Sequence, residues 1–141
     1  MMAKKSRKPG VGLALSGGAA RGIAHAGVLE VLVEAGIAVR AVAGTSAGSV
    51  VGALFAAGVT PTEIGRLALE TRWSDLLRVR MPHAGMVSGE GLERFFEHVI
   101  PARTFDELRL PFAAVTTDLA TGERVDLASG LLARAVLASC S

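Results

Sequence analysis

A Gly-Thr-Ser-Ala-Gly sequence centred on Ser46 constrains the fold of this 141-residue chain more than any other segment. It follows an apolar run at 38–43, which predicts a buried strand, and precedes small and apolar residues at 49–57, which predict a helix. In a G-x-S-x-G turn the chain passes so sharply from strand to helix that the serine is strained, and glycines such as Gly44 and Gly48 avoid a clash. We therefore expect a nucleophile elbow, and a small-residue turn without catalysis is the alternative.

A second strand-to-helix turn is expected at residues 16–22, which read Ser-Gly-Gly-Ala-Ala-Arg-Gly between an apolar strand at 11–15 and a helix at 20–35. Its glycines allow backbone N–H groups to face an anion, so the turn suits a phosphate or the oxyanion of a tetrahedral intermediate. A dinucleotide site is disfavoured, because Ala19 replaces the middle glycine of G-x-G-x-x-G and no carboxylate lies near Arg40. Both turns are expected at the carboxyl ends of neighbouring parallel strands, where ligands bind in open α/β sheets.

Together the two turns resemble those of the patatin-like phospholipase family, in its bacterial branch related to the catalytic domain of neuropathy target esterase. The resemblance covers nearly the whole chain from residue 11, with 17–22 similar to the family's oxyanion loop and 44–48 to its elbow. Residues 116–122 resemble a mid-domain strand and turn, and 138–141 the start of a segment that continues in relatives. The resemblance implies a three-layer α/β/α fold with a mainly parallel sheet, here an N-terminal portion that is incomplete at the C-terminus.

The resemblance also implies a serine acyl hydrolase of the phospholipase or lysophospholipase type, which cleaves acyl esters of lipids with a Ser–Asp dyad and needs no cofactor. Ser46 would be the nucleophile, and Gly17, Gly18 and Ala19 would form the oxyanion hole. The family's aspartate lies in an Asp-Gly-Gly or Asp-Gly-Ala motif, which does not occur here. We therefore expect the base beyond Ser141 and little activity from this chain alone. A non-catalytic lipid-binding or interaction module is the alternative.

Four further residues belong to the supporting motif: Arg21, Gly22, Gly44 and Gly48. Arg21 is a candidate for orienting the glycine-rich loop or meeting a lipid phosphate, and a surface or structural salt bridge is an equal alternative. Asp118 is the carboxylate most easily confused with the dyad base. Its Asp-Leu-Ala-Thr-Gly context favours a turn-capping role instead.

The histidines do not form a predicted triad or metal site. His25 is expected near the glycine-rich loop but precedes Ser46, whereas α/β-hydrolases have the chain order Ser, acid, His. A packed or surface histidine is therefore favoured at this position. His83 and His98 are expected in a loop and on an exposed helix face, and the three histidines lack metal-ligand spacing. The single cysteine, Cys140, is expected to be a small packed residue.

The composition is typical of an α/β domain whose strands are buried, since 50% of the residues are hydrophobic and 20% are charged. The net charge of +2 comes mostly from residues 1–10, which we expect to be a basic flexible tail before a domain at 11–141. A disordered tail is favoured, and weak attraction to anionic lipid, about 1 kcal/mol per basic residue, is the alternative. Nucleic-acid binding has little support, because Tyr is absent and no basic stripe lies outside the tail.

The start of the chain is too short and glycine-broken in its apolar part to predict a secretory signal, and no run of about twenty apolar residues predicts a membrane span. We expect a cytoplasmic protein, with peripheral membrane contact as an addition, and the sequence does not indicate an oligomeric state.

Residues 60–63 predict a helix start, with Thr60 as the N-cap, Pro61 at the first helical position and Glu63 completing a capping box. The helix is expected to continue through 64–71. The remaining expected elements are a helical piece at 73–79, a loop at 80–91, a helix at 92–100, strands at 111–117 and 123–127, and a helix at 131–138.

Overall fold

The computed structural model describes residues 10–71 and 90–141. In this part of the chain, strands and helices are interspersed, as the sequence predicts for an α/β domain. In chain order the elements are β1 (Val11–Leu15), the 3₁₀ helix η1 (Ala19–Ile23), α1 (Ala24–Glu34), β2 (Val39–Thr45), α2 (Ala47–Ala56), α3 (Pro61–Glu70), α5 (Glu90–Val99), the 3₁₀ helix η2 (Phe105–Glu107), β3 (Phe112–Thr117), β4 (Arg124–Leu127) and α6 (Leu132–Cys140).

The four strands form one mixed sheet in the order β1-β2-β3-β4. β1, β2 and β3 are parallel, and β4 pairs with β3 in the antiparallel direction. The register places Leu15 beside Gly44, and Thr45 beside Val115. The carboxyl ends of the three parallel strands therefore lie at one edge of the sheet, and the two glycine-containing turns both start from this edge.

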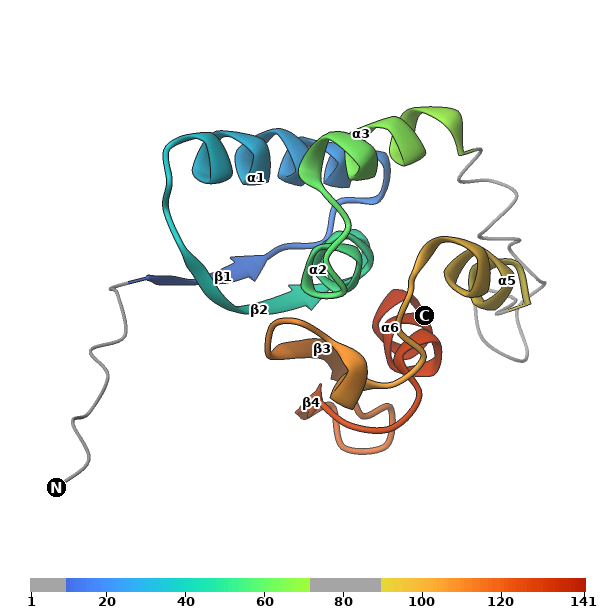
Figure 1. Ribbon diagram of the computed structural model, residues 1–141. Helices are drawn as coiled ribbons and strands as arrows, with labels where there is room; N and C mark the ends of the chain where they lie inside the picture. The colour runs from blue at the N-terminus through green and yellow to red at the C-terminus, as the bar shows by residue number, and fades with distance from the viewer. Residues whose placement is uncertain (1–9, 72–89) are drawn as a thin grey trace, which may run out of the picture.

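The central helix α2 lies against β2 and β3, while α1 and α3 pack on each other and over α2 (Figure 1). α6 packs against α2 and β3, and α5 packs against α6. Gly52 permits the close approach of α2 to the sheet, because a Cβ at this position would lie 2.9 Å from Cε2 of Phe112 and 3.0 Å from Cγ1 of Val42. The core between these elements includes the fully buried side chains of Leu29, Ile64, Leu132 and Val136.

Along the described strands, the side chains that point away from α2 remain half-buried. They include Leu13, Ala41, Ala43 and Ala113. They line a shallow apolar groove of about 410 Å³. The sheet is therefore well buried on its α2 side and less so on this side. No helix that the structure describes is long and apolar enough to cross a membrane.

The predicted helices differ from the observed ones by one to four residues at their starts. The helix expected at 20–35 begins as η1, whose first residue Ala19 has a φ of +48°, and becomes α-helical only at Ala24. α2 begins directly after Ser46, two residues earlier than expected. The Thr60 cap of α3 is confirmed, since its Oγ1 accepts a hydrogen bond from the Glu63 N–H at 3.3 Å.

The helical piece expected at 73–79 and most of the loop expected at 80–91 lie outside the described residues. α5 begins at Glu90, so the last two residues of that expected loop are helical. The strands expected at 111–117 and 123–127 and the helix expected at 131–138 are confirmed within two residues at each end.

Candidate active site

Ser46 lies at the junction of β2 and α2 with φ +51° and ψ −122°. A positive φ is rare for a residue with a side chain, and holding one there costs about 1–3 kcal/mol. In the described part of the chain only Ser46 and Ala19 combine a side chain with a positive φ, and they lie in the two turns that the sequence singles out. The backbone at Ser46 therefore has the strained strand-to-helix geometry of a nucleophile elbow.

Hydrogen bonds fix both main-chain groups of Ser46. Its N–H donates to Oγ of Ser139 at 2.9 Å, and that hydroxyl donates to the carbonyl of Val115 at 2.5 Å. The Ser46 carbonyl accepts from the N–H and the Oγ of Ser49, at 2.8 and 2.7 Å, and from the N–H of Val50 at 3.2 Å. Contacts from α2 and α6 thus balance the strain at this residue.

The glycines of the two turns sit where a side chain would overlap the neighbouring backbone. A Cβ on Gly44 would overlap the carbonyl of Gly48, and a Cβ on Gly48 would lie 2.6 Å from the carbonyl oxygen of Ser16. A Cβ on Gly22 would overlap the Cβ of Ala47. The elbow and the glycine-rich loop therefore interlock, and this contact explains why both sequences consist of small residues.

Of the candidate oxyanion residues, Gly17 lies directly against Ser46. A Cβ added to Gly17 would be 3.3 Å from the Ser46 Cβ and 4.0 Å from its Oγ. Gly18 has a φ of +157°, Ala19 has a φ of +48°, and the Gly18 carbonyl accepts from the N–H of Arg21 at 3.0 Å. The structure therefore brings the glycine-rich loop and the serine together at the carboxyl edge of the sheet.

Arg21, the candidate contact for a lipid phosphate, and the histidines have different environments. Arg21 is exposed, and its guanidinium makes no hydrogen bond or ion pair with the residues that the structure describes. His25 is half-buried on α1, and its Nε2 donates to the Ser16 carbonyl at 2.9 Å. His98 is exposed on α5, whereas His83 lies outside the described residues.

Asp118 caps the turn between β3 and β4. Its Oδ1 accepts hydrogen bonds from the N–H groups of Ala120 at 2.8 Å and Thr121 at 3.1 Å, and its carbonyl accepts from Gly122 at 2.8 Å. The carboxylate is thus engaged with its own turn, in the role that its sequence context favours. Within residues 10–71 and 90–141, no hydrogen bond joins it to Ser46.

Cys140 lies beside the elbow at the end of α6. Its Sγ is 4.0 Å from the Oγ of Ser49, a fully buried side chain. Burial raises the pKa of the Cys140 thiol, and the hydroxyl groups of Ser49 and Ser46 oppose that shift. A thiol with a raised pKa stays protonated at neutral pH, so Cys140 acts as a packed neutral residue, as the sequence predicts.

Residues 13–141 match the model of the patatin-like phospholipase family. The chain belongs to this family. It is 36% identical over 137 residues to an NTE family protein of Mycobacterium bovis, covering 95% of this chain and 38% of that protein. It is 34% identical over 139 residues to patatin-like phospholipase domain-containing protein 7 of Rattus norvegicus, covering 93% of this chain and 10% of that protein.

Solved structures show the same fold at low sequence identity. The structure of full-length SpcU in complex with full-length ExoU of Pseudomonas aeruginosa matches with a TM-score of 0.67 at 19% identity, covering 96% of this chain and 39% of that chain. These matches confirm the α/β/α fold and the family that the two turns predict. The chain spans well under half the length of each of these relatives.

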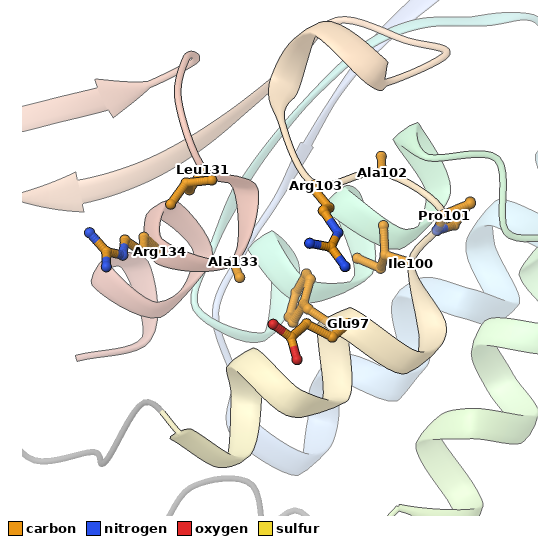
Figure 2. Close-up of a pocket in the computed structure, with 9 residues that line it drawn as sticks. Glu97, Ile100, Pro101, Ala102, Arg103, Leu131, Ala133 and Arg134 are labelled. Atoms are coloured by element: carbon orange, nitrogen blue, oxygen red, sulfur yellow. The ribbon is translucent and has the colours of Figure 1, made fainter.

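A further cavity in the described part of the chain lies away from Ser46. A cavity of about 370 Å³ opens between α5 and the N-terminal end of α6, lined by apolar side chains together with Glu97, Arg103 and Arg134. Figure 2 shows Glu97 and Arg103 turned toward this space and the guanidinium of Arg134 turned away from it. Ser139, which contacts Ser46, is at the other end of α6. The cavity is therefore separate from the elbow.

Sequence reasoning missed two residues that hold the elbow, Ser139 and Ser49. The bond from the Ser49 hydroxyl to the Ser46 carbonyl could have been predicted, because Ser49 lies three positions after Ser46 at a helix start, where a hydroxyl commonly bonds to the main chain. Ser139 had no local signal, since it is 93 residues away from Ser46.

Proposed function

We propose that this chain carries the nucleophile and the oxyanion hole of a serine hydrolase that cleaves acyl esters of lipids or phospholipids. One observation carries the proposal: Ser46 is held at φ +51° beside Gly17, with its N–H and carbonyl both hydrogen-bonded. Strain of this kind persists only where surrounding contacts maintain it, and it is concentrated at functional sites. Membership of the patatin-like phospholipase family supplies the substrate class.

In the proposed reaction the Ser46 Oγ attacks the carbonyl carbon of the ester and forms the new C–O bond, while its proton passes to a carboxylate base. That base is an aspartate outside residues 1–141, as the family resemblance implies. Collapse of the tetrahedral intermediate breaks the bond to the alcohol, which leaves with the proton. Water then attacks the acyl-serine by the same route and releases the fatty acid and the free Ser46 hydroxyl.

Backbone N–H groups of Gly17, Gly18 and Ala19 are the proposed oxyanion donors, each contributing on the order of 3 kcal/mol to transition-state stabilisation. The N–H of Ser46 cannot serve, because it donates to Ser139. The N–H of Ala47 is a further candidate donor, since the first residue of a helix has no acceptor within its own helix. The negative oxyanion would also gain from the positive end of the α2 dipole.

The proposed substrate also bears on where in the cell the protein acts. Lipid esters are presented at membrane surfaces, so we infer a cytoplasmic protein that meets its substrate by peripheral contact with a membrane. The basic residues before Val11 favour such contact with anionic lipid.

Replacement of the nucleophile tests the proposal in the complete protein. We expect Ser46→Ala to abolish hydrolysis of a p-nitrophenyl acyl ester and covalent labelling by a fluorophosphonate, with the fold intact because alanine fits the same turn. Thr62→Ala is the matched control, since it removes an exposed hydroxyl on α3 that donates to Glu30. Wild-type turnover by the Ser46→Ala protein would refute the proposal. Lipid binding by wild type without turnover or labelling would favour a non-catalytic lipid-binding module.

A further inference from the structure

We infer that His25 is a positioning residue, which holds the glycine-rich loop in the conformation that oxyanion binding requires. Its Nε2 donates to the carbonyl oxygen of Ser16 at 2.9 Å. Ser16 directly follows β1, and His25 is the second residue of α1, so this bond closes the segment that contains the loop and η1. The inference rests on the proposed function of Ser46 and adds a role for a side chain that the reaction itself does not use.

The geometry of the peptide bond links His25 to the site. In a trans peptide the C=O of one residue and the N–H of the next point in opposite directions within one plane. The described residues contain no cis peptide bond. When His25 fixes the direction of the Ser16 carbonyl, it therefore also fixes the direction of the Gly17 N–H. Gly17 is the loop residue that lies against Ser46, with an added Cβ only 4.0 Å from the serine Oγ.

The Ser16 carbonyl is confined from a second side by Gly48 of α2. A Cβ on Gly48 would lie 2.6 Å from this oxygen, so the carbonyl passes over the helix start with no space for a side chain. His25 on α1 and Gly48 on α2 thus hold the same peptide unit from two helices. This arrangement sets the loop in register with the elbow.

The loop needs such a restraint because its own sequence supplies little rigidity. Adjacent glycines at 17 and 18 have more conformational freedom to lose than other residues, and Ala19 adopts a left-handed conformation. Oxyanion stabilisation depends on donors that are already oriented before the reaction. A hydrogen bond to the first peptide of the loop restricts it at the point nearest the nucleophile.

The same bond distinguishes this role from that of a triad base. A carbonyl oxygen only accepts hydrogen bonds, so Nε2 carries the hydrogen when it contacts Ser16. An Nε2 that already carries a hydrogen and directs it to the backbone cannot accept the proton of Ser46, and within the described residues no hydrogen bond joins the other ring nitrogen, Nδ1, to Ser46. His25 therefore acts through the loop and not on the reacting atoms.

We would compare His25→Leu and His25→Gln in the complete protein. Leucine removes the donor with a similar side-chain volume, and the glutamine amide offers an N–H at about the same reach. We expect His25→Leu to lower kcat about 10- to 100-fold with KM changed less than about threefold, in line with misplacement of oxyanion donors. Affinity for a trifluoromethyl ketone, which forms an anionic tetrahedral adduct, should fall by a similar factor. His25→Gln should recover most of both losses, and the shape of the pH–rate profile should match that of wild type.

A readout without turnover separates this inference from the proposed function. We expect the ¹⁵N–¹H resonances of Gly17 and Gly18 to shift and their hydrogen exchange to accelerate in His25→Leu, and to return toward wild type in His25→Gln. His98→Leu is the matched control, because it removes an exposed histidine on α5.

The outcomes are distinguishable. Absence of Ser46 labelling in wild type would refute the proposed function, and the amide resonances would still report on the loop. Wild-type kcat and unchanged amide resonances in His25→Leu would overturn the inference. It would also be overturned if His25→Leu and His25→Gln lost activity equally and only in proportion to a lower unfolding temperature, because that result indicates a purely structural role.

Discussion

Removing the Ser139 hydroxyl should loosen the elbow without changing Ser46, the proposed nucleophile. Ser139 is 8% exposed, and its hydroxyl joins the N–H of Ser46 to the carbonyl of Val115. Ser139→Ala keeps the Cβ and deletes only this bridge. It leaves one donor and one acceptor without this partner in a part-buried setting, where an unsatisfied polar group costs about 1–3 kcal/mol.

We therefore expect Ser139→Ala to lower the free energy of unfolding by about 2–4 kcal/mol, the sum of two groups at the lower end of that range. Because the Ser46 N–H loses its anchor, the strained φ should relax in part of the population, and kcat should fall about 10-fold or more. Urea unfolding followed by circular dichroism measures the first effect, and ester hydrolysis by the complete protein measures the second.

Ser141→Ala is the matched control, since its exposed hydroxyl donates to the carbonyl of Leu137 one turn earlier. We expect it to change the free energy of unfolding by less than about 0.5 kcal/mol. If Ser139→Ala and Ser141→Ala were equally stable and both retained wild-type kcat, the bridge from α6 would not maintain the elbow and this reasoning would be wrong.

Two further predictions concern the thiol and the chain in isolation. Burial raises the pKa of Cys140, so iodoacetamide at pH 8 should alkylate the native protein more slowly than the urea-unfolded protein, and equal rates would contradict the burial. Because the unfolded chain loses the thiol proton first, the free energy of unfolding should fall as the pH rises through the ordinary thiol pKa of about 8.5, and Cys140→Ala should lack that component of the fall. Residues 1–141 expressed alone should show little esterase turnover, since their described part places no base at Ser46, and should bind a hydrophobic dye at the half-buried sheet groove. Robust Ser46-dependent turnover by the purified monomer would show that these residues contain a base, with Asp118 the first to test.

The parts of the site that are local in sequence could be predicted from sequence. The turn at Ser46 needs small residues within two positions, so its pattern is complete in a pentapeptide. The same holds for the glycine-rich loop, for the Thr60 cap and for the turn that Asp118 caps, because each depends on neighbours in the chain. The strand edge at which the two main turns meet followed from the parallel order of the strands.

The contacts that hold the site could not be predicted in the same way. The Ser139 hydroxyl reaches Ser46 only because α6 packs against α2 and β3, and residue types alone do not encode such long-range packing. The 3₁₀ start at η1 escaped prediction for a related reason. Alanine has high helix propensity, but propensity does not predict that the chain enters this helix through Ala19 at a φ of +48° and a 3₁₀ turn.

The bond between Ser46 and Ser139 has a consequence for how the elbow forms during synthesis. The two residues are 93 positions apart, so β2 and the start of α2 leave the ribosome long before α6 exists. Until Ser139 arrives, the Ser46 N–H lacks its partner and the strained backbone has little to maintain it. Domains are completed from the N-terminus during translation, and contacts of long sequence separation form late. The 93 residues that separate the two serines must therefore be synthesised before docking of α6 can supply the hydroxyl that anchors the Ser46 N–H.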